Sequence, residues 1–562
     1  MAALAAPASA AAADSQAVSP SRQLERPPSQ TAPPPGHRLS ARQAIRIAER
    51  SERLRSEVSE HRGYTREAYT KGPGTWQVSY FDRGKEIAQA IVDERTARPT
   101  EVWTGPQVAW QMARGLPGAF GRKVNAPYVW IPLMLAFMVP FFDWRRPFRL
   151  LHLDLLVLLA FSLSHIWFNK GEIFTSVPLV YPVLAYLLLR MLAVAYVPRL
   201  RERTPHRLLV PTSYLLLGLI FLVGFRAGLN MTNSNVIDVG YSGVIGADRL
   251  THGESLYGNF PSDDSAGDTY GPVNYYAYVP FELIFPWSGK WDDLPAAHAA
   301  ALVFDLATIV ALFFAGRRLR RGRAGWDLGV MLAYGWASYP YTLFVLNSNA
   351  NDSLVALLLV CTFLALQSSR LRGAALALAA AVKFAPLALV PLLTGYARTR
   401  RNAIRFLTAF VAVGAIVLLP VVLDGGPRLF WDRTVGFQLG RDSPFSIWGQ
   451  HDGLDWAHDL FKGLTVALAL LVALVPRRKS PVQMAALGAA VLIALEISLT
   501  HWFYLYIVWF FPFVLMALLG AARFDGEPEA AVAEEGGVKA PESRSARSTE
   551  PALRPSIRPG TP

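Results

Sequence analysis

Blocks of apolar residues dominate this chain, and most are long enough to cross a membrane. At 1.5 Å per residue, a helix of roughly 18–22 residues matches the ~30 Å hydrocarbon core of a bilayer. The blocks cover 125–143, 151–168, 175–197, 208–225, 295–315, 325–345, 352–368, 403–424, 456–476, 481–499 and 503–520. The pattern predicts an all-α polytopic membrane protein with about 10–12 transmembrane helices.

Short basic clusters separate many of these blocks and predict which helix ends face the cytoplasm. They lie at 144–149, 198–207, 317–323, 369–372, 398–401 and 477–479. Because cytoplasmic loops are enriched in Lys and Arg, all six clusters are expected inside. Counting crossings between them then places the loops 226–294 and 425–455, the turn 347–352 and the segment around His501 outside, and the C-terminal tail inside.

Two segments do not fit a simple alternation of crossings. Residues 373–397 lie between two basic clusters, so they are expected to enter the membrane and return as a short helical hairpin, broken near Pro386. The first block, 125–143, contains Pro132 and Pro140. If it spans, the N-terminal region lies outside; if it is re-entrant or interfacial, that region stays in the cytoplasm. We favour the second arrangement, because the start of the chain lacks the features of a signal peptide.

The two ends of the chain differ from its apolar middle. Residues 1–37 are rich in Ala and Pro, and residues 521–562 in Glu, Pro, Ser and Arg, so both are expected to be disordered. Residues 38–105 predict a small α+β domain, with a charged helix over 40–61 followed by alternating strands. This order resembles a PepSY-like module. Residues 125–205 are expected to add transmembrane helices before the main membrane domain.

Composition agrees with a membrane protein. Of the 562 residues, 52% are hydrophobic and 17% charged, and the formal net charge is +13. The positive charge lies in clusters between apolar blocks, which favours membrane topology over nucleic-acid binding. The single cysteine, Cys361, lies inside an apolar block and is expected to be a buried packing residue. No metal-ligand spacing is present, so neither a metal nor a cofactor is expected.

Aromatic, acidic and amide residues are concentrated in the segments expected outside. Such a mixture suits a sugar, because its apolar ring faces pack on aromatic rings while its hydroxyls bind carboxylates and amides. Loop polarity alone is also ordinary for solvated loops.

The order of the motifs in these segments resembles a membrane glycosyltransferase of the GT-C superfamily. The chain reads DVGY at 238–241, GADR at 246–249, GESLYG at 253–258 and DTYGPVNYY at 268–276, followed by a helix ending in GRRLRRGRAG. The later stretch 347–393 is similar to the GT87 (DUF2029) type, the polyprenol-phosphate-mannose-dependent mannosyltransferase-like proteins. It contains the asparagine turn NSNAND, a helix, a basic loop and the hairpin motif AVKFAP. The resemblance covers roughly residues 206–520, and it departs from the family at YGPVNYY, where two prolines are usual.

The resemblance implies an integral-membrane, inverting glycosyltransferase of the cell membrane. It would move a sugar, expected to be mannose, from a polyprenyl-phosphate donor to an extracytoplasmic glycan or glycolipid in cell-envelope synthesis. The absence of a Walker A or Rossmann motif from the sequence agrees with a lipid-linked donor. The implied partners are the donor, the acceptor and the bilayer, without nucleic acid.

Three cations are candidates for binding the donor phosphate. Lys383 lies in the middle of the apolar hairpin, where an unpaired ammonium is costly. Its alternatives are pairing with a nearby carboxylate or reaching to the membrane interface. Arg433 and Arg441 lie in an outside loop, where arginines are also often only solvated.

The candidates for binding sugar are Tyr257, Asp268, Tyr270, Asn274, Asn347, Asn351 and His501. The two tyrosines are expected to stack against a sugar ring. The asparagines could bind hydroxyls, or the turn could cap the helix that starts near Ser353, and capping is favoured for Asp352. His501 resembles the late histidine of the family; an ordinary interfacial residue is its alternative.

Asp238 is the candidate general base. It is the first acid after the helix predicted to end near Phe225, so it should lie near the membrane surface, where the bond between phosphate and sugar emerges. One carboxylate suffices because the leaving group is already a phosphate. Asp268 is a rival, and Asp248 is a second rival that is expected instead to pair with Arg249. As a structural alternative, Asp238 could cap a helix beginning near Gly240.

Two other function classes stay open at this stage. A transporter or flippase for lipid-linked saccharides would also use aromatics and a buried lysine, but it predicts polar residues on both sides of the membrane. A membrane sensor or anchor built around the PepSY-like module gives no reason for the loops rich in Asp and Tyr.

Overall fold

The computed structural model describes most of the chain. The described residues are 25–71, 73–83, 85–104, 123–169, 173–197, 204–234, 236–261, 264, 266–289, 294–396, 399–439, 443 and 445–525. Arg441 and most of the two ends expected to be disordered lie outside them. Residues 25–37 are an exception, because Glu25 pairs with Thr70 of the N-terminal sheet through two backbone hydrogen bonds.

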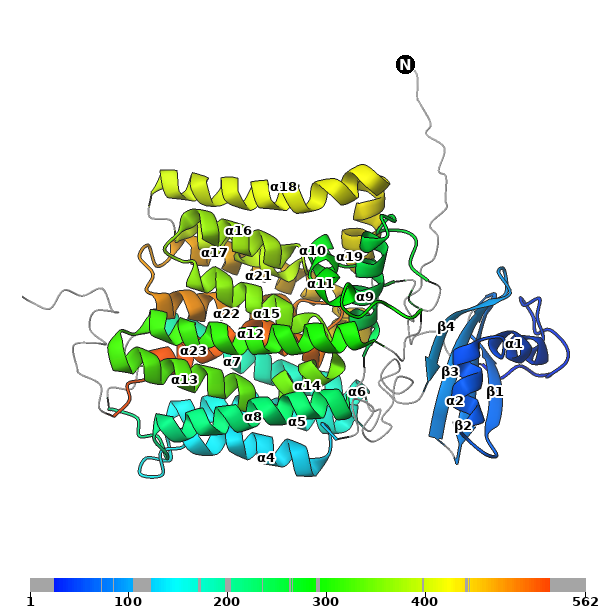
Figure 1. Ribbon diagram of the computed structural model, residues 1–562, viewed down its shortest axis with the longest axis horizontal. Helices are drawn as coiled ribbons and strands as arrows, with labels where there is room; N and C mark the ends of the chain where they lie inside the picture. Colours follow the sequence, from blue (N-terminus) through cyan, green and yellow to red (C-terminus); the bar gives the residue numbers. More distant parts are fainter. Residues whose placement is uncertain are drawn as a thin grey trace, which may run out of the picture.

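A bundle of roughly parallel helices forms the main body (Figure 1). Seven segments are long and apolar enough to cross a membrane. They are α5 (Leu150–Phe168), α7 (Val180–Tyr196) with the turn before it, α8 (Thr212–Thr232), α12 (Pro295–Leu319), α18 (Arg400–Trp431) with its extension, α21 (Asp455–Leu474) and α23 (Ile507–Ala521) with the turn before it. The shorter apolar helices α15 (Asp352–Leu364) and α22 (Pro481–Ile497) pack among them in the bundle. The predicted all-α membrane fold is confirmed.

The helices connect two ends of different character. The described parts of the basic clusters define one end, called the basic end. Arg149 donates to the Pro205 carbonyl (2.7 Å), the His206 N–H donates to the Arg523 carbonyl (2.6 Å), and Arg320 donates to the Gly520 carbonyl (3.1 Å). Lys479 precedes α22, whose Gln483 donates to the Ala195 carbonyl at the end of α7 (2.8 Å). At the loop end lie the segments 233–294 and 432–455, the turn 347–351 and residues 498–506. The chemistry-bearing residues predicted from the sequence are therefore grouped at one end of the bundle.

The first helix, α4 (Pro127–Met138), runs from the loop end to the basic end. Before it, the Lys123 N–H donates to Asn233 Oδ1 (3.1 Å) at the loop end of α8. After it, the Pro140 carbonyl accepts from the Leu209 N–H at the basic end (3.0 Å). The expectation that block 125–143 is re-entrant or interfacial is therefore wrong. The chain enters the bundle at the loop end, so the N-terminal domain is attached at that end.

Two of the bundle's elements are broken. One crossing consists of α13 (Gly322–Ser338) and α14 (Pro340–Ser348), separated where Pro340 disfavours a continuous helix. The predicted hairpin is confirmed: α16 (Ser369–Ala380) enters from the basic end, and the 3₁₀ turn η5 (Ala385–Leu389) leads into α17 (Val390–Gly395), which returns. At its base, the Arg372 guanidinium lies 5.3 Å from the Tyr396 ring, so both arms start and end at the same end.

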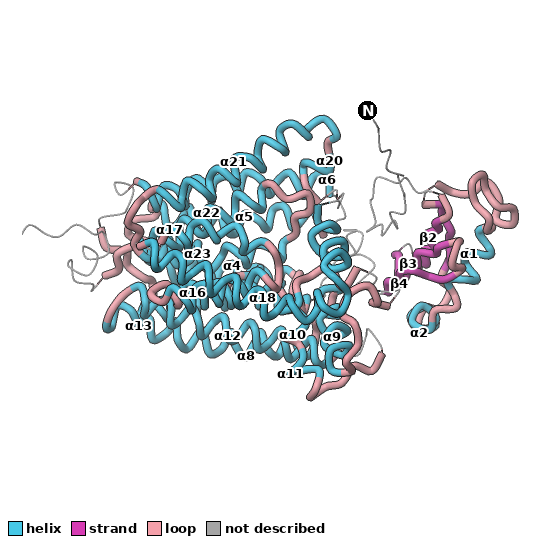
Figure 2. Tube along the Cα trace, turned by 90° about the horizontal axis from the view of Figure 1, so that it is seen from above, coloured by secondary structure: helices cyan, strands magenta, loops and turns pink. Residues whose placement is uncertain are grey.

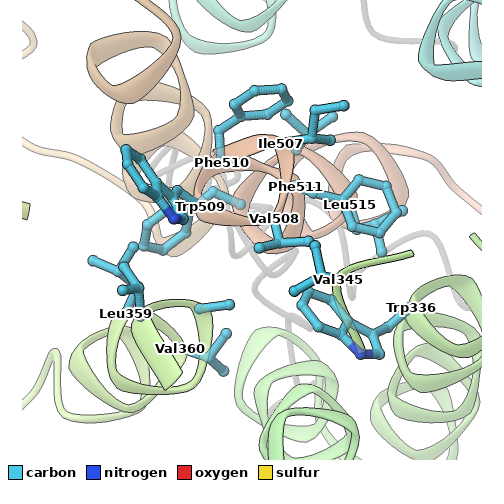
Figure 3. Close-up of a cluster of buried hydrophobic side chains, with 14 of the residues drawn as sticks. Trp336, Val345, Leu359, Val360, Ile507, Val508, Trp509, Phe510, Phe511 and Leu515 are labelled. Atoms are coloured by element: carbon cyan, nitrogen blue, oxygen red, sulfur yellow. The ribbon is translucent and has the colours of Figure 1, made fainter. Parts of the chain in front are cut away.

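The core is built around α23, of whose apolar window 89% is buried. Phe511 stacks on Tyr339 with 4.1 Å between ring centroids. Figure 3 shows Val508 and Phe511 among side chains from α13, α14 and α15, including Trp336 and Leu359. By contrast, only 11% of the apolar window of α18 is buried, so this helix presents most of its surface to lipid. Cys361, expected to be buried, is half-buried and free.

The N-terminal domain is an antiparallel sheet with two helices, drawn apart from the bundle in Figures 1 and 2. The strands β1 (Thr65–Thr70), β2 (Thr75–Asp82), β3 (Lys85–Asp93) and β4 (Arg98–Thr104) pair in sequence order. Trp76, Val78 and Tyr80 form its core. The predicted α+β domain is confirmed, although β1 was not predicted. The single helix expected over 40–61 is two helices, α1 (Ala41–Ala48) and α2 (Glu52–Ser59), because Ser51 caps a new helix by accepting from the Leu54 N–H.

Candidate functional site

The turn between α14 and α15, residues 347–351, is the centre of the loop end. Asn349 adopts a left-handed conformation (φ 52°) that ends α14, a position that Asn tolerates better than most residues. Its side chain accepts from Asn230 Nδ2 (2.8 Å) and donates to Ser234 Oγ (3.0 Å). The turn is therefore fixed to the loop end of α8, and its other polar side chains are held in place.

Around this turn, buried polar atoms have no hydrogen-bond partner among the described residues. Such atoms are uncommon, because each costs about 1–3 kcal/mol. They are Asn274 Nδ2, Tyr278 Oη, Tyr341 Oη, Asn347 Oδ1, Asn351 Oδ1, Asp352 Oδ2, Ser353 Oγ and Glu496 Oε1. Several of these residues are neighbours. Asn351 Nδ2 donates to Asn274 Oδ1 (2.7 Å). Burial is the larger cause that raises the pKa of the Tyr278 hydroxyl, and the nearby charge of Asp352 is the second cause. These donors and acceptors are available to a polar ligand.

Lys383, at the tip of the hairpin, lies beside this cluster. Its Nζ donates to Asp352 Oδ1 (2.6 Å), which also accepts from Trp509 Nε1 (2.8 Å). The ammonium lies 5.3–5.5 Å from the ring centroids of Tyr270, Tyr506 and Trp509. Lys383 therefore pairs with a carboxylate, which is one of its two predicted alternatives. The surrounding aromatic rings form a cage that stabilises the cation. Asp352 does not cap α15: it is the first residue of that helix, and its carboxylate is committed to Lys383.

The hairpin tip also contacts the loop before α10 (Pro272–Tyr276). The Gly271 N–H donates to the Val382 carbonyl (3.1 Å), and the Val273 N–H donates to the Ala381 carbonyl (3.0 Å). A Cβ at position 271 would lie 2.2 Å from the Ala381 oxygen, so only glycine permits this approach. These contacts bring Tyr270 over Lys383.

Asp238 is the first residue of α9 (Asp238–Thr251), a short helix packed across the loop end. The N-terminus of α9 is tied to the central turn, since the Ile237 N–H donates to the Ser348 carbonyl (3.1 Å). Asp238 is half-buried, and the capping residue is Ile237, so the alternative in which Asp238 caps a helix beginning near Gly240 does not hold. A carboxylate in the first turn is favoured by the helix dipole. The helix thus holds the candidate base next to residues 347–351.

Close packing of α9 leads to a testable expectation. An added Cβ at Gly246 would lie 2.1 Å from the Tyr275 ring. Gly246→Ala is therefore expected to destabilise the protein by about 1–3 kcal/mol, as overpacked cores do. Thermal unfolding in detergent measures this. Gly228→Ala is the matched control, because nothing lies within 4 Å of its added Cβ. Equal unfolding temperatures for the two variants would contradict the expectation.

Asp268 and Arg433 form a buried ion pair and are not free to bind substrate as predicted. The Asp268 side chain is fully buried; Oδ2 accepts from Arg433 Nε (2.7 Å) and from the Gly258 N–H (2.6 Å), and Oδ1 accepts from Arg433 Nη2. The pair joins the loop before α10 to the segment after α18. Because its oxygens are already occupied, Asp268 is also a poor rival to Asp238 as the base.

Removing half of this ion pair tests its structural role. Arg433→Ala leaves the buried Asp268 carboxylate without its guanidinium. This is expected to lower the free energy of unfolding by about 3 kcal/mol. The value is at the low end for buried pairs because a quarter of the Arg433 side chain is exposed. Arg428→Ala is the control: its pair with Asp432 is 3.8 Å long and exposed, so the change is expected within about 0.5 kcal/mol. A similar loss of unfolding free energy in both variants would contradict the assignment.

Other predicted roles change for similar reasons. Tyr257 is 3% exposed, and its hydroxyl donates to the Tyr270 carbonyl (2.9 Å), so it packs in the protein core instead of stacking on a sugar. Asp248 pairs with His252 (3.3 Å), whereas Arg249 pairs with Glu254 (3.2 Å), so the expected Asp248–Arg249 pair is wrong.

His501 lies at the edge of the site. Its Nδ1 is 2.7 Å from Ser443 Oγ, and its ring is 6.3 Å from that of Tyr506, one of the rings around Lys383. Tyr270, Asn274, Asn347, Asn351, Lys383 and His501 are thus grouped around the central turn, while Arg441 lies outside the described residues.

Three members of the site were missed by sequence reasoning. Tyr506 and Trp509 lie in the last apolar block, where nothing distinguishes them from packing residues. Glu496 lies at the loop end of α22, fully buried, with Oε2 accepting from Trp502 Nε1 (2.9 Å). A lone carboxylate in an apolar block is itself a functional signal, and it could have identified Glu496.

Comparisons with known proteins give a family match and a structural likeness. Residues 269–533 match the model of Glycosyltransferase family 87. The chain also resembles the crystal structure of ArnT from Cupriavidus metallidurans bound to undecaprenyl phosphate, with 16% identity and a TM-score of 0.36, over 58% of this chain and 62% of that chain. The chain therefore spans less than two thirds of that protein. No curated protein matches.

Proposed function

We propose that this protein, whose residues 269–533 match the model of glycosyltransferase family 87, is a membrane glycosyltransferase that transfers a sugar from a polyprenyl-phosphate donor to an acceptor hydroxyl. The observation that carries the proposal is the group of buried, unpartnered polar atoms around residues 347–353, beside a caged lysine. Sugar hydroxyls both donate and accept hydrogen bonds, so they suit this mixture of amide, hydroxyl and carboxylate atoms.

The proposed reaction inverts the anomeric centre. The acceptor oxygen attacks the anomeric carbon, and Asp238 takes the hydroxyl proton as the new C–O bond forms. The bond between the anomeric carbon and the phosphate oxygen breaks, and the polyprenyl phosphate leaves with the electron pair. Lys383 retains N–H donors beyond the one given to Asp352, and these would stabilise the negative charge that develops on the leaving phosphate.

The donor is expected to keep its lipid tail in the bilayer while its phosphate and sugar reach the loop end. We place this end on the extracytoplasmic face of the cell membrane, since the opposite end carries the basic clusters. Asn274, Asn347 and Asn351 are the proposed sugar-binding residues, with Tyr270 and His501 at the edge of the site. Mannose is the first sugar to test, and the acceptor is a glycan or glycolipid of the cell envelope.

The test uses the full chain reconstituted in liposomes with radiolabelled polyprenyl-phosphate mannose and extracted envelope glycolipids. Transfer of label to an acceptor supports the proposal, and polyprenyl phosphates carrying other sugars define the specificity. No product from any polyprenyl-phosphate sugar would contradict it. If labelled donor instead crossed the bilayer unchanged, the protein would be a lipid-linked saccharide flippase.

A further inference from the structure

A polar concavity lies at the basic end, where α16 and α18 begin side by side (Figure 1). Its volume is about 440 Å³. We call it the arginine pocket, and it is lined by Gln367, Ser368, Ser369, Arg370, Asn402 and Arg405. Ser368 and Thr399 cap the two helices, accepting from the Leu371 and Asn402 N–H groups. The N-termini of two helices therefore meet at one cavity.

The charges at these helix starts oppose the usual preference. A helix N-terminus carries a partial positive charge and favours acidic residues in its first turn. Neither α16 nor α18 has an acid there. Instead, Arg370 lies in the first turn of α16, and Arg400 and Arg401 begin α18. Arg405 follows Asn402 by three residues and so shares its helix face. Positive charge is thus added to two ends that are already positive.

Three other cations at the basic end are neutralised or favourably placed. Arg323 pairs with Asp327 (3.3 Å), Lys479 donates to the carbonyls of Ala473 and Pro476, and Arg317 lies in the last turn of α12, where a cation is favoured. Within the described residues, Arg370 and Arg405 make no ion pair with a carboxylate. Membrane topology accounts for basic residues at this end, but not for their convergence, unpaired, on one cavity.

A buried arginine, Arg372, lies two residues after Arg370 and behind the lining of the pocket. Arg372 is 2% exposed, and its guanidinium lies 5.3 Å from the ring of Phe406, the residue after Arg405. One amino group donates to the Leu366 carbonyl, while Nε and Nη2 have no hydrogen-bond partner among the described residues. Gly373 allows this close packing, since a Cβ there would lie 2.3 Å from the Phe406 oxygen.

We propose that the arginine pocket binds a phosphate group. Guanidinium groups and helix N-termini both present N–H donors to phosphate oxygens, and Ser369 and Asn402 add polar side chains. The phosphate can come from the headgroup of an anionic phospholipid or from a free phosphate. Because α18 presents most of its surface to lipid, a headgroup can enter the pocket while its acyl chains stay beside that helix. This site is separate from the proposed transfer reaction at the loop end.

The experiment compares lipid and phosphate binding by the full chain. Native mass spectrometry of detergent-purified protein measures retention of phosphatidylglycerol against phosphatidylcholine, and thermal unfolding with 0–10 mM inorganic phosphate measures the free ion. Arg370→Gln/Arg405→Gln is the test variant. Arg317→Gln/Arg318→Gln is the matched control, because it removes the same charge from the same end but outside the pocket. The test variant is expected to lose about tenfold in binding, and the control to keep wild-type binding.

A third variant separates loss of binding from loss of folding. Ser369→Glu places a carboxylate in the first turn of α16, which favours the helix but fills the pocket with negative charge. It is expected to fold and to lose binding. Selective retention of phosphatidylglycerol identifies a lipid source, and stabilisation by phosphate without lipid identifies a soluble one. Equal binding by wild type, the Arg370/Arg405 variant and Ser369→Glu would overturn the proposal, as would equal losses in the test and control variants.

Discussion

Asp238→Asn is expected to lower the rate of sugar transfer by about 10²–10⁴-fold while the protein stays folded. Asparagine keeps the shape of the side chain at the start of α9 but cannot take the proton from the acceptor hydroxyl. The measurement is the transfer of radiolabelled sugar in liposomes at saturating donor. Unfolding temperatures recorded for the same preparations separate loss of chemistry from loss of structure.

Asp248→Asn is the control for that substitution. Asp248 lies on the same helix and pairs with an exposed histidine, so its loss is expected to leave most of the activity. Asp268→Asn is expected to reduce stability together with activity, because it breaks the buried pair with Arg433. Near-full activity in Asp238→Asn, with selective loss in a folded Asp268→Asn variant, would reverse the assignment of the base.

Lys383→Met is expected to destabilise the protein by about 3–5 kcal/mol, the usual cost of leaving one member of a buried ion pair alone. The Asp352 carboxylate is fully buried and would keep only the Trp509 hydrogen bond. Unfolding in detergent measures the loss. The double variant Lys383→Met/Asp352→Leu is expected to recover most of the stability, since apolar residues of similar volume often replace a buried pair without penalty.

The double variant also separates the two roles of Lys383. If the lysine only balances the charge of Asp352, the refolded double variant keeps its activity. If the lysine contacts the donor phosphate, the double variant is stable but remains inactive. We expect this second result. A stable and active Lys383→Met single variant would contradict both roles.

The apolar helices of the bundle could largely be predicted from the sequence, because the signals that determine them are local. An apolar block of sufficient length predicts a span, and a basic cluster beside it predicts its orientation. The hairpin followed from the same logic, since basic residues flank both sides of a segment broken near Pro386. The prediction failed for block 125–143, where it relied on the composition of the first residues instead of on the block itself. The contacts at its two ends, to Asn233 and Leu209, come from distant segments that local patterns do not reveal.

The residues of the candidate site could be selected from the sequence, but their pairing partners could not. Residue type and position led to Lys383 and to the acids of the loops, which the structure brings together at the loop end. Their partners depend on the fold: Lys383 pairs with a residue 31 positions away, and Arg433 with one 165 positions away. A single sequence carries no information on such distances. Tyr257 shows the same limit, because only the packed loop reveals that its ring is buried.

The contact between Gly271, Val273 and the hairpin tip has a consequence for biosynthesis. The loop that contains Gly271 and Val273 is synthesised before the hairpin. Its N–H groups donate to the carbonyls of residues at the tip of that hairpin. During translation this loop reaches the loop end first, without its hydrogen-bond partners. The hairpin tip reaches the loop only after α16 has been inserted from the basic end. The two can be completed only together. The candidate site therefore cannot be completed before the hairpin has been inserted.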